Sequence, residues 1–264
     1  FENLSFRNGY DELGTGGGLA TFDAGSTVRN CVFDSNHASY SGGLYSNNYS
    51  EDPTLIIDCR FVNNTCDNSG GGLGVLGADN TVSNCVFTGN DAGSGGGMIA
   101  DGGWSTTSIL DCTFQGNSAT DKGGGVWNFG WVDVTMDGCT ISGNSAAFGG
   151  GVFHGETEST FTISNSTICD NAPDAVSGAY ADGGGNSIHL YCPDNDGTLH
   201  VPTEYLTIAS AVATAVDGET IEIAAGTYNE HDIIFDKSIT IQGAVDGNGE
   251  PTTIIDGESV SFIM

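Results

Sequence analysis

The chain has 264 residues, of which 34 are acidic and only 5 are Lys or Arg, so its formal net charge is −29. Binding to nucleic acid requires several phosphate-neutralising Lys or Arg side chains, so this composition excludes nucleic acid as a partner. No run reaches the roughly 20 apolar residues of a membrane span, and the first residues, FENLSF, show no signal peptide. We therefore expect a mature or excised segment that does not insert into a membrane.

The first two thirds of the chain carry a repeat of about 27 residues. One repeat position is cysteine in five copies, and Leu4 and Ser166 extend the series by one period at each end, which makes seven copies. A Phe or Ile follows this position by two residues and usually an Asn by five, and a glycine run then leads to an apolar residue. The five cysteines are Cys31, Cys59, Cys85, Cys112 and Cys139.

These copies read as short strand runs separated by Asn and Gly turns, with no helical period between them. One copy cannot bury its own apolar side chains, but copies stacked about 4.8 Å apart bury them as ladders of like residues. Asparagine amides at equivalent positions would bond along the stack, and glycine permits positive φ at the corners. The sequence therefore predicts an all-β fold, a right-handed parallel β-helix (β-solenoid) over residues 1–192.

The repeat motifs resemble those of a known group of surface proteins. FDSN, FVNN, FTGN and FQGN, alternating with GGGL, GGGM and GGGV, are similar to the FxxN and GGA[ILV] repeats of chlamydial polymorphic membrane proteins. More broadly, they resemble right-handed β-helix surface proteins of the pectin-lyase-like superfamily. The resemblance covers about residues 1–192 and implies an extracellular, cell-surface protein of structural or adhesive role.

The repeat register breaks after Cys192, at a turn-rich segment that we interpret as a linker over residues 193–202. Residues 203–264 begin with an Ala-rich stretch, for which we expect a helix near 204–216, and continue with strand-like runs at 220–224 and 238–243. The apolar face of this helix comprises Tyr205, Ile208, Val212 and Val216. This segment resembles the N-terminal cap of pectin-lyase-like β-helices, so we expect a capping helix and the first coils of a next β-helix unit.

The end of the chain fits the register of its beginning. Joined together, IMFENLSF places Ile263, Phe1, Leu4 and Phe6 at the spacing of the apolar repeat positions. The predicted assembly surface comprises Phe1, Leu4, Phe6, Val260, Phe262, Ile263 and Met264. Three arrangements are compatible with this pattern: a tandem array in one chain, subunits that meet head to tail, or ends that meet within one molecule. The first two make copies of the unit its principal partner.

The cysteines divide into a ladder and a remainder. Neighbouring ladder cysteines lie within disulfide range if the coils stack, but we favour free thiols that pack as small apolar groups. Cys169 and Cys192 lie off the ladder and form a candidate disulfide. Four N-x-[ST] sequons, each a candidate glycosylation site, begin at Asn3, Asn48, Asn63 and Asn165.

Two Asx-Gly segments, DNDG at 194–197 and DGNGE at 246–250, carry the oxygen ligands that calcium prefers. The candidate metal ligands are Asp194, Asp196, Asp246, Asn248 and Glu250, and calcium is the one cofactor that the sequence suggests. The alternative interpretation of both segments is an ordinary Asx-Gly turn.

Aromatic residues recur one position after the apolar residue of the glycine run. Tyr45, Trp127 and Phe153 should point outward there, with Trp104 and Trp131 nearby. Such an exposed row suits stacking on carbohydrate or contact with a host surface, unless loops cover it.

Catalytic residues are not evident in the pattern. Arg60 is the one basic residue in a strand core of the middle coils, and no pair of carboxylates stands out as a glycosidase would require. We therefore expect a non-enzymatic, extracellular structural or adhesive unit. A carbohydrate-active β-helix, either a polysaccharide lyase or a glycoside hydrolase, and a glycan-binding adhesin are the alternatives.

Overall fold

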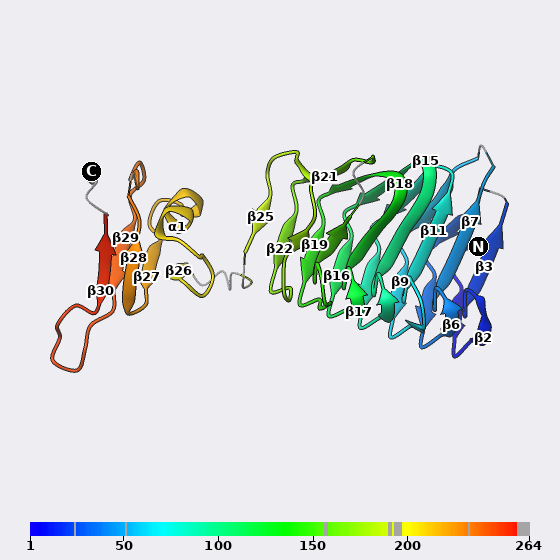
Figure 1. Ribbon diagram of the computed structural model, residues 1–264, viewed down its shortest axis with the longest axis horizontal. Coiled ribbons are helices and arrows are strands. Elements are labelled where there is room, and N and C mark those ends of the chain that lie inside the picture. Colours follow the sequence, from blue (N-terminus) through cyan, green and yellow to red (C-terminus); the bar gives the residue numbers. More distant parts are fainter. Residues whose placement is uncertain are drawn as a thin grey trace. The chain divides into compact units, whose positions relative to one another are not determined.

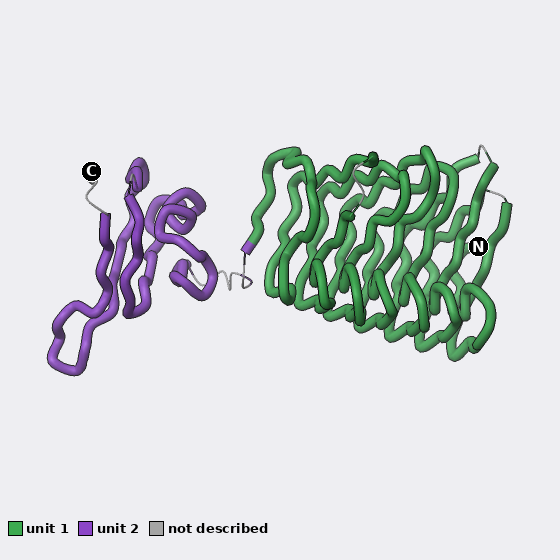
Figure 2. The backbone as a smooth tube through the Cα atoms, viewed as in Figure 1, with its two compact units in different colours: residues 1–188 green, residues 189–264 purple. Residues whose placement is uncertain are grey.

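The computed structural model describes residues 1–264 except 24, 51, 156–157, 190–191, 193–196, 232 and 258–264. The chain divides into two compact units, Phe1–Ile188 and His189–Met264 (Figure 2). The first unit ends at Ile188, slightly before the predicted boundary at residue 192, because Ile188 closes the last strand of the stack.

The first unit is a right-handed β-helix (Figure 1), and the whole chain forms about nine turns of about 27 residues. Its three sheets are parallel throughout. The first sheet runs in the order β1 (Ser5–Arg7), β5 (Val32–Asp34), β9 (Arg60–Val62), β13 (Val86–Thr88), β16 (Thr113–Gln115), β19 (Thr140–Ser142), β22 (Thr167–Cys169) and β25 (Ser187–Ile188). The second runs in the order β17 (Ser118–Lys122), β14 (Asp91–Ser94), β10 (Thr65–Cys66), β6 (His37–Tyr40) and β2 (Tyr10–Thr15).

The third sheet contains the longest strands. Its main path is β23 (Val176–Ser177), β20 (Val152–His154), β18 (Val126–Asp137), β15 (Met98–Leu110), β11 (Leu73–Gly77), β7 (Leu44–Asn48) and β3 (Leu19–Phe22). Strands β4 (Thr27–Arg29), β8 (Thr54–Ile57), β12 (Asn80–Ser83), β21 (Phe161–Ser164) and β24 (Ala181–Asp182) pair beside this path. β15 and β18 span both parts of the sheet and pair along their length, with one register shift between Gly103 and Ser105.

The register of the strands confirms the predicted repeat. Phe6 pairs with Phe33, Phe33 with Phe61, and the series continues through Phe87 and Phe114. These rings stack in parallel with centroids 4.5–4.9 Å apart along the axis. The structure adds an eighth position, because Ile188 pairs with Ile168. Sequence periodicity missed it because this coil takes only 20 residues.

The asparagine position also forms a ladder. From Asn36 to Asn171, each side-chain amide nitrogen donates to the amide oxygen of the asparagine one coil further, at 2.9–3.0 Å. The six asparagines are at most 5% exposed. The predicted bonding of amides along the axis is therefore confirmed.

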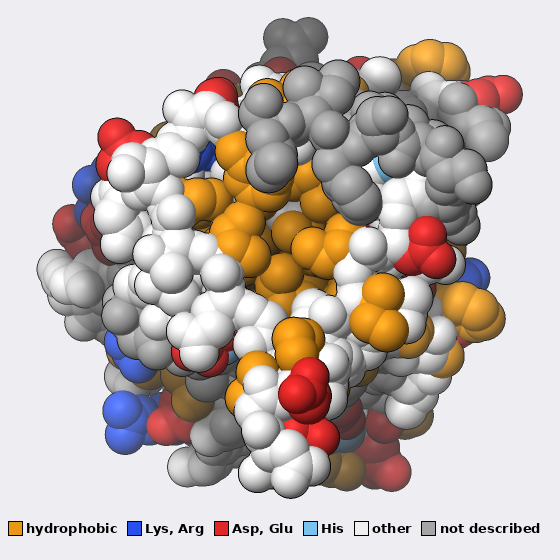
Figure 3. All heavy atoms as spheres, turned by 90° about the vertical axis from the view of Figure 1, so that its left-hand side faces the viewer, with side chains coloured by type: hydrophobic (Ala, Val, Ile, Leu, Met, Phe, Trp, Pro, Cys, Tyr) orange, Lys and Arg blue, Asp and Glu red, His pale blue; other side chains and the backbone are white. Residues whose placement is uncertain are grey.

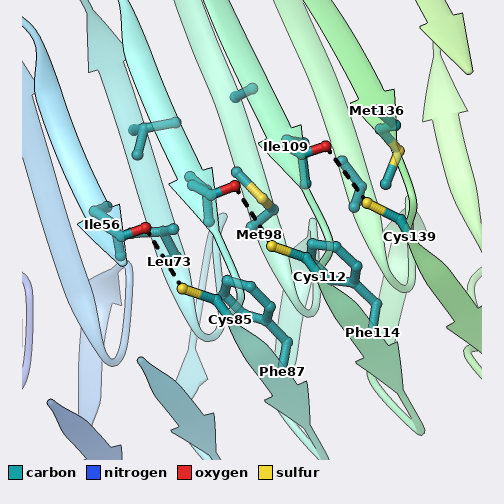
Figure 4. Close-up of a cluster of buried hydrophobic side chains, with 14 of the residues drawn as sticks. Ile56, Leu73, Cys85, Phe87, Met98, Ile109, Cys112, Phe114, Met136 and Cys139 are labelled. Carbon is teal, nitrogen blue, oxygen red and sulfur yellow. Dashed lines mark hydrogen bonds between the residues drawn. The ribbon is translucent and has the colours of Figure 1, made fainter. Parts of the chain in front are cut away.

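The ladder cysteines are buried free thiols, as the favoured interpretation held. Each Sγ of Cys85, Cys112 and Cys139 donates to a main-chain carbonyl one coil earlier, at 3.4–3.6 Å (Figure 4). Burial raises the pKa of the Cys139 thiol from the usual 9.0 to about 12. The Cys139 thiol therefore remains neutral at neutral pH. The ladder cysteines as a group fill space between the phenylalanine and aliphatic ladders of the core.

The glycine runs have two distinct roles. The first glycine of a run, such as Gly95, Gly123 or Gly149, has a positive φ of 61–63°, which L side chains disfavour. The following glycines do not need positive φ. A Cβ added to Gly124 would overlap the carbonyl oxygens of Ser145 and Gly150 in the next coil. The expectation that the runs serve corner conformations is thus correct for their first residue, and close stacking explains the others.

In its described residues, the second unit has one helix, α1 (Ile208–Thr214), and two small parallel sheets. One sheet runs β26 (Thr198–Val201), β27 (Thr220–Ile223) and β29 (Thr240–Gly243), and the other pairs β28 (Gly226–Asn229) with β30 (Thr253–Asp256). Tyr205, Ile208 and Val212 are buried in its core, as predicted, but Val216 is 60% exposed. The helix ends at Thr214, so Val216 no longer lies on its apolar face.

The predicted linker over residues 193–202 is partly wrong. Residues 198–201 form β26, which pairs in register with β27 from Thr198 opposite Thr220 to Val201 opposite Ile223. Leu199 and Val201 alternate into the core of this unit. The prolines and glycines around the segment suggested a turn. The alternation of buried and more exposed residues that Leu199 and Val201 set up is instead typical of a strand.

Candidate ligand groove on the outer face of the β-helix

The outer face of the third sheet carries aromatic side chains because strand residues alternate between the two faces. In β18, Val126 and Asn128 are buried inside, whereas Trp127 and Phe129 point outward. Trp127 pairs with Ile99 of β15, which lies in one row with Gly74 of β11 and Tyr45 of β7. The predicted outward orientation of Tyr45 and Trp127 therefore holds.

A second outward row lies beside the first. Phe129 of β18, Asp101 of β15, Leu76 of β11 and Asn47 of β7 occupy equivalent register positions. A groove of about 320 Å³ is lined by residues of both rows and by Thr15, Tyr40, Ser41 and Ser69 beside them. Its walls include Tyr40, Tyr45, Ile99, Asp101, Trp127 and Phe129.

Gly74 explains why the groove exists. It stands where the neighbouring strands carry Tyr45 and Ile99, so the first row has a gap of one side chain. The hydroxyl of Ser41 occupies the space that a Cβ on Gly74 would need. The floor is therefore shallow and polar at this point, and the walls on either side are aromatic or aliphatic.

The aromatic walls are fixed by mutual contacts. The Trp127 and Phe129 rings lie 4.8 Å apart between centroids and tilt by 39°. Tyr45 packs against Phe22 at 5.7 Å, and its hydroxyl accepts a hydrogen bond from Asn47 Nδ2 at 3.4 Å. Burial raises the pKa of Tyr45, so this phenol is neutral at neutral pH.

Asp101 is the carboxylate of the groove. Burial raises the pKa of this side chain, and the backbone N–H of Gly102 opposes the shift only in part. None of the described residues that line the groove is Lys, Arg or His. A glycosidase uses two carboxylates, whereas Asp101 is the one carboxylate among the described lining residues.

Phe153 follows Trp127 in the same row, on β20, but it does not line this groove. Its ring makes a cation–π contact within the chain, since Lys122 Nζ lies 5.5 Å from the ring centroid. Trp104 and Trp131 form a separate exposed pair with centroids 5.7 Å apart. The structure therefore brings together Tyr45 and Trp127 of the predicted contact residues and leaves Phe153 apart.

Sequence reasoning missed Phe129 and Asp101. The signal for Phe129 was present in VWNFGWVD, where every second residue from Trp127 to Trp131 is aromatic. Asp101 carried no such signal, because an aspartate in a turn-rich acidic chain looks like many others. Its place in the groove follows only from the pairing of β15 with β18.

The described part of the predicted calcium ligands forms a hydrogen-bonded turn. Asp246 Oδ1 accepts the backbone N–H groups of Asn248 at 2.8 Å and Glu250 at 3.0 Å. These hydrogen bonds define an ordinary Asx turn, which was the alternative interpretation. No three His, Cys, Asp or Glu side chains of the described residues gather around one point as metal ligands would. Asp194 and Asp196 lie outside the described residues.

The sequon asparagines differ in accessibility. Asn48 is fully buried, and its Nδ2 donates to Asp52 O at 2.6 Å and to Thr54 Oγ1 at 3.2 Å. A glycan on this nitrogen is incompatible with the fold, so the prediction for Asn48 is wrong. Asn3, Asn63 and Asn165 are exposed at positive φ of 48–58°, a conformation that asparagine tolerates better than most residues.

The remaining predicted residues lie at the first coil and at the end of the repeat. Phe1 and Leu4 are 54% and 45% exposed, and Phe6 is half-buried against Phe33. The other predicted assembly residues, Val260, Phe262, Ile263 and Met264, lie outside the described residues. Cys169 and Cys192 are both disulfide-bonded.

Comparison with known proteins agrees with this architecture. Residues 17–195 match the family model for the right-handed beta helix region, and the chain belongs to this family. The chain is also 32% identical over 108 residues to metabotropic glutamate receptor-like protein R of Dictyostelium discoideum, an alignment that covers 40% of the chain. It spans only 6% of the length of that relative. No solved structure matches the chain, and none of its described helices has the length and apolarity to traverse a bilayer.

Proposed function

We propose that the chain is a non-enzymatic structural unit whose first coil stacks on the last coil of another copy. The observation that carries the proposal is the exposure of apolar ladder positions in the first coil. Phe1 and Leu4 are 54% and 45% exposed, whereas their equivalents one coil later, Val28 and Cys31, are 1% and 0% exposed. A further coil stacked here would bury them as the others are buried.

The last described coil offers a suitable counterpart. Ile241, Ile254 and Ile255 remain 37–56% exposed there, and Figure 3 shows apolar side chains gathered near the centre of this face, with polar ones to the left of them and below. Parallel strands add in the same direction at either end of a solenoid, so the last coil of one copy continues into the first coil of the next. Such a contact joins two different surfaces and propagates as a filament.

The proposal includes an extracellular location at a cell surface. The likeness of the repeats to β-helix surface proteins supports it, and so does the name of the relative in Dictyostelium, which describes a receptor-like protein. A high negative charge keeps such rods soluble and apart.

The test is the state of association of the whole chain, measured by light scattering and electron microscopy over a range of concentrations. We expect rods of uniform width that grow with concentration and that Leu4→Asp abolishes. Tyr49→Asp is the matched control, because Tyr49 is exposed in the second coil and lies outside the apolar ladders. Compact monomers at every concentration would contradict the proposal.

Ligand binding at the outer face is the second candidate function, and the groove formed by Tyr45, Ile99, Asp101, Trp127 and Phe129 favours it. Exposed aromatic faces are suited to stacking on flat ligands such as sugar rings. Such a groove on a rigid rod would serve adhesion, and it is compatible with end-to-end stacking because it lies on the side of the coils. Quenching of Trp127 fluorescence by added ligand would detect occupancy.

A further inference from the structure

The groove on the outer face unites two features that recognise the same chemistry. Its walls include the aromatic side chains of Tyr45, Trp127 and Phe129, and its charged group is the carboxylate of Asp101. Aromatic faces attract cations through the negative potential of their π-electrons, and a carboxylate attracts them by charge. We infer that the groove binds an organic ammonium group, such as a primary or quaternary alkylammonium. This inference rests on the ligand-binding role proposed for the groove.

Asp101 lacks a cationic partner in the chain. Among the described residues, no basic side chain forms an ion pair with it, and burial disfavours its charged form. A half-buried carboxylate without a cationic partner is unfavourable in the empty protein. An ammonium group placed between it and the rings would restore the missing interaction, whereas a neutral ligand would bury the charge further.

The backbone is shaped around this carboxylate. Gly130 follows Phe129 on β18 and has a positive φ of 78°. A Cβ added at Gly130 would lie 2.8 Å from Asp101 Oδ1. The glycine therefore leaves room for the carboxylate beside the aromatic wall.

In the outward row that contains Trp127, an ammonium group of the chain already lies against an aromatic ring one coil further. Lys122 Nζ lies 5.5 Å from the centroid of Phe153, the residue that pairs with Trp127 one coil further. At Phe153 the chain therefore supplies the cation that contacts the aromatic ring. At Trp127 no basic residue of the described lining takes that place, and charge complementarity with a chain of net charge −29 favours a cation from outside.

The experiment titrates the whole chain with choline and with 3,3-dimethylbutanol, which has the same shape without the charge, at constant ionic strength. Methyl glucoside serves as a neutral sugar probe. Binding is followed by tryptophan fluorescence and by calorimetry. The variants are Asp101→Asn, Trp127→Ala and Gly130→Ala, and the control is Trp131→Ala, an exposed aromatic on the same strand outside the groove. A cooperative unfolding transition in each variant verifies that it folds.

We expect saturable choline binding that is weakened about tenfold or more in Asp101→Asn and Trp127→Ala, is weakened in Gly130→Ala and is retained in Trp131→Ala. Dimethylbutanol should bind far more weakly. Equal binding of the two probes, or binding unaffected by Asp101→Asn, would overturn the inference. Binding of methyl glucoside without choline would also overturn it but would keep the groove as a sugar site. Absence of binding by all three probes would remove both the inference and the ligand-binding role.

Discussion

The asparagines inside the ladder accept two hydrogen bonds on the side-chain oxygen and donate two from the side-chain nitrogen, as Asn117 illustrates. Asn117 Oδ1 accepts from the backbone N–H of Asn90 at 3.0 Å and from Asn90 Nδ2 at 2.9 Å. Its Nδ2 donates to Phe87 O at 3.0 Å and to Asn144 Oδ1 at 2.9 Å. A buried amide is favourable only when its hydrogen bonds are complete, so the ladder fixes the register of the coils as well as stabilising them.

We therefore predict that Asn117→Ala destabilises the first unit by about 3 kcal/mol, because it removes the buried acceptor of the Asn90 backbone N–H and of one hydrogen on Asn90 Nδ2, together with the side-chain donor to Phe87 O. Urea unfolding measures the change. Gln115→Ala is the control, since Gln115 lies two residues earlier on an exposed face and should change stability by less than about 0.5 kcal/mol. Equal effects of the two substitutions would show that the amide ladder contributes little.

At the scale of the element, certain glycines allow neighbouring coils to stack closely. A side chain at such a glycine would collide with a carbonyl group of the next coil. Gly124 is of this kind, since its Cα faces the backbone of Ser145 and Gly150. Gly116 is of another kind. It has a positive φ of 62°, and a Cβ there would meet no atom within 4 Å.

This contrast gives a prediction. Gly124→Ala should destabilise the β-helix by about 3 kcal/mol or more, because neighbouring backbone must shift, whereas Gly116→Ala should cost only the strain of about 1–2 kcal/mol for a left-handed alanine. Thermal and urea unfolding of the two variants measure the difference. A larger effect at Gly116 would mean that backbone conformation, and not close stacking, determines where glycine is required.

The same elements show what the sequence could reveal. Side chains that repeat along a stack leave a periodic trace, so the coils and the amide and thiol ladders were predictable from Cys31, Asn36 and their successors. Features that interrupt the period left no trace: Ile188 closes a shortened coil, and Thr198–Val201 form a strand outside the repeat. Some residues of the groove were predictable from the sequence and others were not. Tyr45 and Trp127 belong to the period, whereas Asp101 becomes a site residue only through the pairing of two long strands.

At the scale of the whole molecule, the residues that the structure describes form two hydrophobic cores with no shared member. The first contains the Phe33, Phe61, Phe87 and Phe114 ladder. The second gathers Tyr205, Ile208 and Val212 against Ile221 and its neighbours in the second unit. Each unit has its own sheets and, within the described residues, no strand of one pairs with a strand of the other.

Two cores should give two unfolding transitions. Phe87→Ala, at a fully buried ring, should destabilise the first unit by about 3–5 kcal/mol and leave the other transition in place. Ile221→Ala, fully buried in the second core, should lower only the transition of residues 189–264, by about 2–5 kcal/mol. Calorimetry resolves the transitions, and hydrogen exchange assigns each to its residues.

A single transition that both substitutions shift equally would mean that the units unfold as one cooperative body. The second unit would then be an integral part of the solenoid. Independent transitions would instead agree with a cap that folds on its own core and presents its last coil to another copy.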